Sequence, residues 1–172
     1  MTTLPFTLLL TVLLALLPTP APTPAPTPAA APPPGRARPL PAPLHLLRGW
    51  HPPPTPYTAG HRGVDLAAPP GTPVRAVADG RVHYAGRVGG RGVLSLTLAG
   101  TALRTTYEPV RPLVAAGDRV TRGQLVARTE AGTHCPTPCL HWGLLAGDTY
   151  LNPLLLLPHP TPRLLPLPRD SD

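Results

Sequence analysis

The sequence contains no isoleucine and no lysine. Because lysine is absent, all 15 of its basic residues are arginine. This bias indicates a GC-rich genome more than a nucleic-acid partner, because nucleic-acid-binding proteins usually combine a basic patch with a recognisable reading motif. No such motif is present, and the arginines between residues 60 and 157 are spread without a cluster. We therefore expect no nucleic-acid partner, and the net charge of +7 suits an anionic polymer instead.

Helical periodicity is also missing, because no window of ten or more residues between 60 and 157 repeats its apolar positions every three to four residues. Apolar residues alternate instead, as at Leu94, Leu96 and Leu98, which share one face of a strand. This pattern predicts an all-β fold, with a small, mostly antiparallel β-sandwich or sheet core. Asp79-Gly80 is expected as a two-residue hairpin turn. The expected strands are 74–78, 81–85, 93–98, 102–107, 125–127 and 139–145.

Most of the 30 prolines lie outside one central segment, since 17 precede residue 60 and five follow residue 157. Proline cannot donate a backbone hydrogen bond and is held near the polyproline II conformation, so proline-rich stretches are spacers rather than core. We expect a proline-rich linker at 32–43, one domain at 44–157 with its core at 60–155, and a proline-rich tail at 158–172. The central segment is too short for a second domain.

The N-terminal segment contains an apolar run at 4–17, which is short for a bilayer span of about 20 residues. Its length is typical of the hydrophobic region of a secretory signal peptide, although no arginine or lysine precedes it. We expect residues 1–31 to be a signal peptide, or a short apolar anchor, followed by the start of the spacer. The protein is thus expected to be exported and extracellular, or membrane-anchored in the second case.

Only two cysteines are present, Cys135 and Cys139, in the string Cys-Pro-Thr-Pro-Cys. In an exported protein such a pair favours a disulfide, whereas in a cytosolic protein it favours metal binding or redox chemistry. The expected export therefore favours a disulfide between Cys135 and Cys139. A loop of this length contributes little to the stability of the whole fold, but it fixes the local backbone.

Candidate chemistry lies in three places: the string His-Arg-Gly-Val-Asp at 61–65, the strand that contains His141, and the loop before it with His134. Histidine and carboxylate side chains bind Zn²⁺ in a tetrahedron, and a hydrolytic zinc site combines three protein ligands with one water. His61, Asp65 and His141 supply such a set. The spacing alone leaves an alternative, in which His61 is an ordinary loop residue and Asp65 forms a turn.

Several strings, in order, resemble those of the lysostaphin/LytM-type zinc metallopeptidases. The opening HRGVDLAAPPGTPV at 61–74, followed by AVADGRV at 76–82, is similar to the opening of that family. GDRVTRGQ at 117–124 resembles its later hairpin. LHWGL at 140–144 and YLNPL at 150–154 resemble its last strand and the segment after it. The resemblance covers nearly the whole of the expected core.

This resemblance implies a β-sheet core and an activity that cleaves peptide cross-links in peptidoglycan. It implies Zn²⁺ as the cofactor, with His61, Asp65 and His141 as its ligands. Peptidoglycan, or its stem and cross-link peptides, is then the expected partner, and another cell-wall hydrolase is a second one. The expected location becomes the cell wall or the extracellular space.

Two departures from the family's pattern fall on its catalytic histidines. The last motif of the family is His-x-His, and the position of its first histidine is Cys139 here. The other catalytic histidine follows a tyrosine by two residues, and in the string TTYEP at 105–109 that position is Pro109. The three ligands are kept while both groups that orient water and stabilise the oxyanion are lost. We therefore expect weak or no peptidase activity by the usual mechanism.

Three interpretations of this altered site are open. The first is a silent domain that binds the cell wall or regulates another hydrolase. The second is a rewired hydrolase in which His134 or Glu108 enters the site as the catalytic group, although His134 can also be a solvent-exposed loop residue. The third is a closed site in which a Cys139 thiolate is the fourth zinc ligand, which leaves no place for water and excludes the disulfide.

Overall fold

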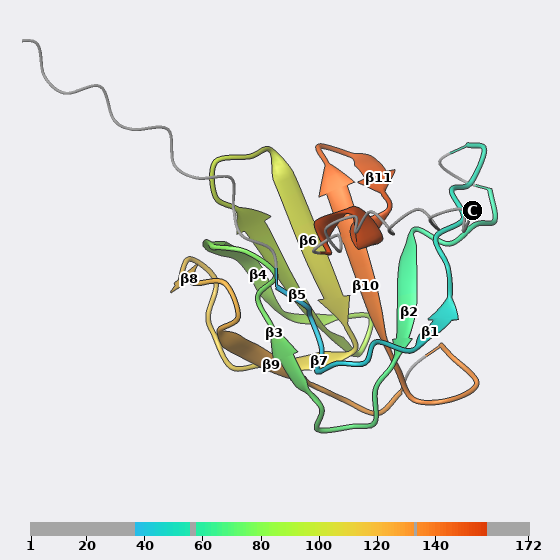
Figure 1. Cartoon of the computed structure of the whole chain (residues 1–172), viewed down its shortest axis with the longest axis horizontal. Coiled ribbons are helices and arrows are strands. Elements are labelled where there is room, and N and C mark those ends of the chain that lie inside the picture. Colours follow the sequence, from blue (N-terminus) through green and yellow to red (C-terminus); the bar gives the residue numbers. More distant parts are fainter. Residues whose placement is uncertain (1–36, 56–57, 133, 158–172) are drawn as a thin grey trace, which may run out of the picture. The chain divides into compact units, whose positions relative to one another are not determined.

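The computed structural model of the protein describes residues 37–55, 58–132 and 134–157, all of which belong to one unit (Figure 1). The expected signal peptide or anchor at 1–31 and the expected tail at 158–172 lie outside the described residues. Among the described residues, no helix is long and apolar enough to cross a membrane.

Two antiparallel sheets make up the fold, and the expected all-β class is confirmed. The strands are β1 (Leu46–Arg48), β2 (Gly63–Ala67), β3 (Pro73–Arg75), β4 (Gly80–Val88), β5 (Arg91–Leu98), β6 (Leu103–Glu108), β7 (Val110–Pro112), β8 (Arg119–Val120), β9 (Leu125–Thr129), β10 (Cys139–Ala146) and β11 (Thr149–Leu151), followed by the 3₁₀ helix η1 (Pro153–Leu156). The larger sheet has the order β1-β2-β10-β6-β5-β4-β8, with β11 paired to β10. The smaller sheet has the order β3-β9-β7, and Figure 1 shows it beside the larger one.

Alternating apolar side chains build one core to which both sheets contribute. In β5, the side chains of Leu94, Leu96 and Leu98 are at most 2% exposed, so the expected alternation is confirmed. Strand β10 lies between β2 and β6 and is buried at nearly every position, which explains its continuous apolar run. His141 is one of its two half-buried residues, and this exception places a polar side chain at the surface of a rigid central strand.

The expected hairpin at Asp79-Gly80 is wrong. Strand β3 pairs with β9 in the smaller sheet, whereas β4 pairs with β5 and β8 in the larger one. The segment between β3 and β4 crosses from one sheet to the other, and Val77 within it is fully buried. Asp79 instead holds a neighbouring turn, because its carboxylate accepts a hydrogen bond from the backbone N–H of Arg122 at 2.7 Å.

The packed chain begins earlier than the expected boundary at residue 44. Leu40, inside the stretch expected as linker, is 5% exposed and belongs to the core. The backbone N–H of Ala37 donates to the carbonyl of Val77 at 2.7 Å, and that of Arg75 donates to the carbonyl of Pro39 at 2.9 Å. The proline content predicted a spacer here, but the backbone N–H of Ala37, the carbonyl of Pro39 and the side chain of Leu40 all make contacts within the fold.

A buried hydrogen-bond chain holds β10 against β6, and we expect its loss to destabilise the protein. Trp142 Nε1 donates to Thr105 Oγ1 at 2.8 Å, and that hydroxyl donates to the carbonyl of Gly143 at 2.9 Å. Thr105→Val keeps the shape but leaves the indole N–H without an acceptor, so the free energy of unfolding should fall by about 1–3 kcal/mol. Urea denaturation measures this, with the exposed Thr97→Val as the control, expected within about 0.5 kcal/mol of the parent. Equal effects of both substitutions would contradict the assignment.

Candidate metal centre

The register between β2 and β10 brings two candidate ligands together. Asp65 lies directly opposite His141 in this antiparallel pair, so that their side chains emerge on the same face of the sheet. His61 lies two residues before β2 and is held by two backbone hydrogen bonds with His51, at 2.7 and 3.0 Å. The pairing of β2 with β10 thus brings His61 and Asp65 close to His141, which lies far from them in the sequence.

The donor atoms of these three side chains converge. His61 Nε2 lies 3.0 Å from Asp65 Oδ1, and His141 Nδ1 lies 2.8 Å from the same oxygen. The two imidazole nitrogens are 3.2 Å apart. His61 is 4% and Asp65 2% exposed, so the cluster is nearly closed to solvent on the side of these two residues.

The protonation of His61 can be assigned from its outer hydrogen bond. His61 Nδ1 lies 2.7 Å from the carbonyl oxygen of Gly49, and a carbonyl only accepts, so Nδ1 carries the proton. In a neutral imidazole the lone pair is then on Nε2, the atom that faces Asp65 and His141. Such an outer hydrogen bond is typical of metal-ligating histidines.

This donor set fits a tetrahedral zinc ion. With metal–ligand bonds of about 2.0–2.1 Å, the ligand atoms of a tetrahedral site are about 3.3 Å apart. The observed separations of 2.8, 3.0 and 3.2 Å are close to this value. His61 Nε2, Asp65 Oδ1 and His141 Nδ1 are therefore spaced as the ligands of a tetrahedral cation would be.

The carboxyl group of Asp65 is ionised in this setting. Burial raises its pKa, but the hydrogen bond from His141 and the positive charges of His61, His141 and His134 outweigh that effect and hold the pKa at about 2. At neutral pH Asp65 therefore carries a negative charge, and this charge lies between three imidazoles.

His134 joins the cluster from the loop before β10. Its Nε2 lies 3.1 Å from Asp65 Oδ2 and 3.2 Å from Oδ1. Its ring centroid is 5.4 Å from that of His141 and 6.3 Å from that of His61, whereas the latter two are 4.9 Å apart. The His134 side chain is also 32% exposed. His134 therefore stands at the open edge of the cluster and is joined to it through the carboxylate.

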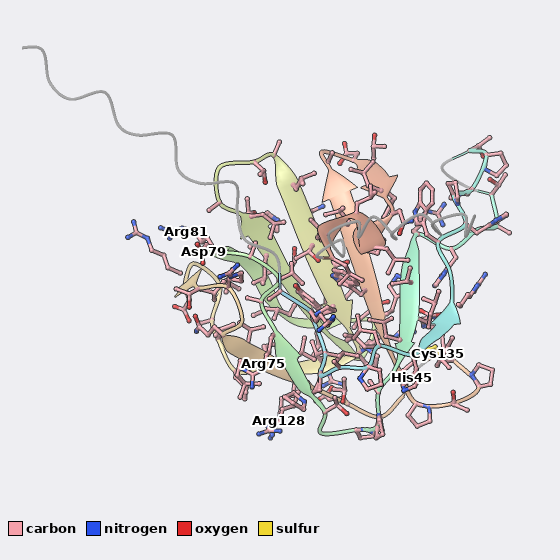
Figure 2. All side chains as sticks on the ribbon, viewed as in Figure 1. His45, Arg75, Asp79, Arg81, Arg128 and Cys135 are labelled. Atoms are coloured by element: carbon pink, nitrogen blue, oxygen red, sulfur yellow. A yellow bond between two sulfur atoms is a disulfide. The ribbon has the colours of Figure 1, made fainter. Side chains whose placement is uncertain are left out.

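A disulfide between Cys135 and Cys139, with a Cα separation of 6.2 Å, closes the segment that directly follows His134. Figure 2 shows the labelled Cys135 at the end of the sheet near β1. The sulfur of Cys139 is bonded to sulfur and is not a thiolate, so the interpretation of Cys139 as a fourth zinc ligand does not fit this structure. The disulfide instead ties His134 to the first residue of β10.

Comparison with known proteins identifies the family. A scan of protein families matches residues 59–153 to Peptidase family M23. The chain belongs to this family. Over 121 residues it is 41% identical to the Uncharacterized protein Rv2891 of Mycobacterium tuberculosis. The aligned region covers 67% of this chain and 48% of that protein. The chain thus spans about half the length of the curated relatives that it matches.

Solved structures give the same result, and the expected lysostaphin/LytM-type resemblance is confirmed. The catalytic domain of the antimicrobial peptidase lysostaphin from Staphylococcus simulans aligns with a TM-score of 0.56 at 25% identity, covering 65% of this chain and 90% of that domain. A zinc-containing peptidase from Vibrio cholerae aligns with a TM-score of 0.57 at 27% identity, and the alignment covers 66% of this chain and 37% of that peptidase. This chain is similar to both in fold.

The two positions at which the sequence predicts that the catalytic histidines are replaced make other contacts. Cys139 is in the disulfide, and Pro109 is buried, with its carbonyl accepting a hydrogen bond from the N–H of Glu130 at 3.0 Å. Glu108 lies opposite His141 in the sheet, but its carboxylate accepts from Arg91 at 3.1 Å. The four donors that the structure brings together are His61, Asp65, His134 and His141, without Glu108.

The sequence reasoning missed two glycines that shape the site. Gly49 supplies the carbonyl that orients His61. At Gly63, a side-chain Cβ would lie 2.5 Å from the carbonyl oxygen of Trp142 and 2.7 Å from Nε2 of His141, so the ring of His141 occupies the space that only glycine leaves. The place of Gly63 between His61 and Asp65 was visible in the sequence, but the ring that covers it comes from β10.

We expect Gly63→Ala to weaken zinc binding by about 10- to 100-fold, because the added methyl group must displace the His141 ring or the β10 backbone. Competition with a chromophoric chelator measures the zinc affinity. Gly49→Ala is the matched control, since a Cβ at Gly49 meets nothing within 4 Å and its carbonyl is kept. Parent-like zinc affinity of Gly63→Ala would show that His141 is not a ligand in this orientation.

A hollow of about 370 Å³ opens beside the cluster. It lies between β1 and the disulfide loop, and one of its walls is the carboxylate that the histidines share. Its lining residues are Leu47, Arg48, Asp65, His134, Cys135, Pro136 and Thr137. A peptide bound there would pass directly in front of His134.

Proposed function

We propose that this domain is a zinc-dependent peptidase that acts on the peptide cross-links of peptidoglycan outside the cell. His61 Nε2, Asp65 Oδ1 and His141 Nδ1 are the proposed ligands. The observation that carries the proposal is their mutual separation of 2.8–3.2 Å around a buried, ionised carboxylate. Membership of family M23 and the likeness to lysostaphin and to a zinc-containing peptidase support it.

When bound, zinc would polarise the scissile carbonyl and lower the pKa of water. The remaining task is proton transfer, and His134 is the proposed group for it. Its Nε2–H donates to the Asp65 carboxylate at 3.1 Å. The other ring nitrogen, Nδ1, would take a proton from the attacking water and return it to the leaving amine, while the carboxylate stabilises the imidazolium. Its partial exposure lets it exchange protons with solvent. His134 would thus replace the imidazoles missing at Pro109 and Cys139.

The proposal is tested with purified peptidoglycan and the zinc-loaded protein. We expect new amino groups and soluble peptides to be released by the parent and not by His141→Ala. Amine release is measured with an amine-reactive dye, and the products are identified by mass spectrometry. Release that is equal in the parent and in His141→Ala, or absent from both, would reject the peptidase function.

A non-catalytic cell-wall-binding or hydrolase-regulating module is the second candidate. The observation that favours it is the presence of a fourth donor, the imidazole nitrogen of His134, since four protein ligands would close the tetrahedron against water. In that case the protein should sediment with purified cell walls without releasing peptides. Zinc affinity would then fall on His134→Ala, whereas a proton-transfer role leaves zinc affinity nearly unchanged.

A further inference from the structure

Arg48 stands next to the proposed zinc site on the neighbouring strand. It is the last residue of β1, the edge strand of the larger sheet, and the register places it opposite Asp65. Cross-strand partners in an antiparallel pair emerge on the same face, so Arg48 is on the side of the cluster. Together with Asp65 and His134 it lines the hollow between β1 and the disulfide loop.

The positive charge of Arg48 is not neutralised by the fold. The carboxylate of Asp65, its cross-strand partner, is already contacted by His61, His134 and His141 at 2.8–3.2 Å. Within the described part of the chain, no ion pair or hydrogen bond joins the Arg48 side chain to another residue. Arg48 is exposed to solvent, so no desolvation cost has to be offset before it receives an anion.

We propose that Arg48 binds a free carboxylate of the peptide substrate, and that the domain therefore prefers acidic peptides whose carboxylate flanks the bond facing His134. This inference rests on the proposed function and names the substrate class of the same site. The planar guanidinium matches a carboxylate with two parallel hydrogen bonds. Leu47 and Pro136, which also line the hollow, would contact the aliphatic part of the same residue.

The rest of the hollow is consistent with an anionic ligand. Its lining contains Asp65 as the one acidic residue, and the Asp65 carboxylate already contacts three imidazoles at 2.8–3.1 Å. A carboxylate bound at Arg48 would therefore pair with the guanidinium, while the one acidic side chain of the lining is engaged by its histidines. A substrate carboxamide has one acceptor oxygen and no negative charge, so it would lose the ion pair with the guanidinium and one of the two parallel hydrogen bonds.

The experiment compares two peptides that differ only in this group, a free carboxylate and its carboxamide, next to the amide to be cleaved. Binding of each is measured by isothermal titration calorimetry with the full-length, zinc-loaded protein, and cleavage is followed separately by chromatography. We expect the parent to bind the acid about 5- to 10-fold more tightly than the amide. Arg48→Gln should remove this preference, and Arg48→Lys, which keeps the charge without the planar fork, should retain part of it.

Arg111→Gln is the matched control, because Arg111 is an exposed arginine on β7 of the smaller sheet and should leave the preference unchanged. Equal binding of acid and amide by the parent, or a preference that persists in Arg48→Gln, would overturn the proposal. Binding with the expected preference but without cleavage would support the carboxylate site and reject the peptidase function. Cleavage of both peptides without any preference in binding would support the peptidase function and reject the carboxylate site at Arg48.

Discussion

Asp65→Ala is expected to abolish zinc binding and all peptidase activity. Asp65 Oδ1 contacts His61 at 3.0 Å, His141 at 2.8 Å and His134 at 3.2 Å, so its removal takes away a ligand and the charge that holds three imidazoles together. Elemental analysis after dialysis should fall from about one zinc per chain to background. Hydrolysis of peptidoglycan should fall by more than about 10³-fold, because the electrophile is lost with the metal.

The same variant has a second readout that does not depend on activity. Zinc that binds only the folded state stabilises it by about 2.7 kcal/mol at a free concentration of 100 times the Kd. The parent should therefore melt several degrees higher with zinc than without it, whereas Asp65→Ala should melt at the same temperature in both conditions. Asp148→Ala is the control, since Asp148 lies between β10 and β11, away from the cluster. A zinc-dependent shift that survives in Asp65→Ala would contradict the proposed ligand set.

His134→Ala is expected to keep its zinc and to lose about 10²- to 10⁴-fold in kcat/KM, which is the usual contribution of one general acid–base group. The reason is the position of His134 at the open edge of the cluster, in contact with the carboxylate and 32% exposed. Zinc affinity is measured by chelator competition and kcat/KM with a defined cross-link peptide, on the same preparations.

The two quantities separate the possible roles of His134. A large loss of zinc affinity would identify it as a fourth ligand and would favour the non-catalytic module. Unchanged zinc affinity together with unchanged hydrolysis would show that His134 neither binds zinc nor takes part in the reaction. His83→Ala is the control for a surface histidine, since His83 is exposed on β4 and, within the described part of the chain, its ring forms a hydrogen bond only with the guanidinium of Arg104.

Much of the fold could be predicted from local patterns. The alternation at Leu94, Leu96 and Leu98 determined a strand with one buried face, because the side-chain period of a strand is two. The pairing of strands could not be predicted in the same way. Asp79-Gly80 is a good turn sequence, but a turn signal does not say whether the flanking segments pair with each other, and here they enter different sheets.

For the site, the residue types and their order along the chain were sufficient to nominate His61, Asp65 and His141. Whether His134 belonged with them was left open, because the position of a loop relative to a strand depends on contacts distant in sequence. The structure brings His134 to the carboxylate and closes its loop with the disulfide. The hydrogen bond from His61 to the carbonyl of Gly49 could not be predicted either, because every residue has a backbone carbonyl and the sequence does not show which one a side chain will contact.

The sequence by itself thus determined the all-β class, the family resemblance and the three candidate ligands, because periodicity and motif order are properties of the chain. Only the tertiary structure decided that β2 and β10 are in register at Asp65 and His141 and that β1 carries Arg48 beside them. These are non-local facts. They follow from which strand edges pair once the core is buried, and that choice is made by the packing of the whole domain rather than by any one segment.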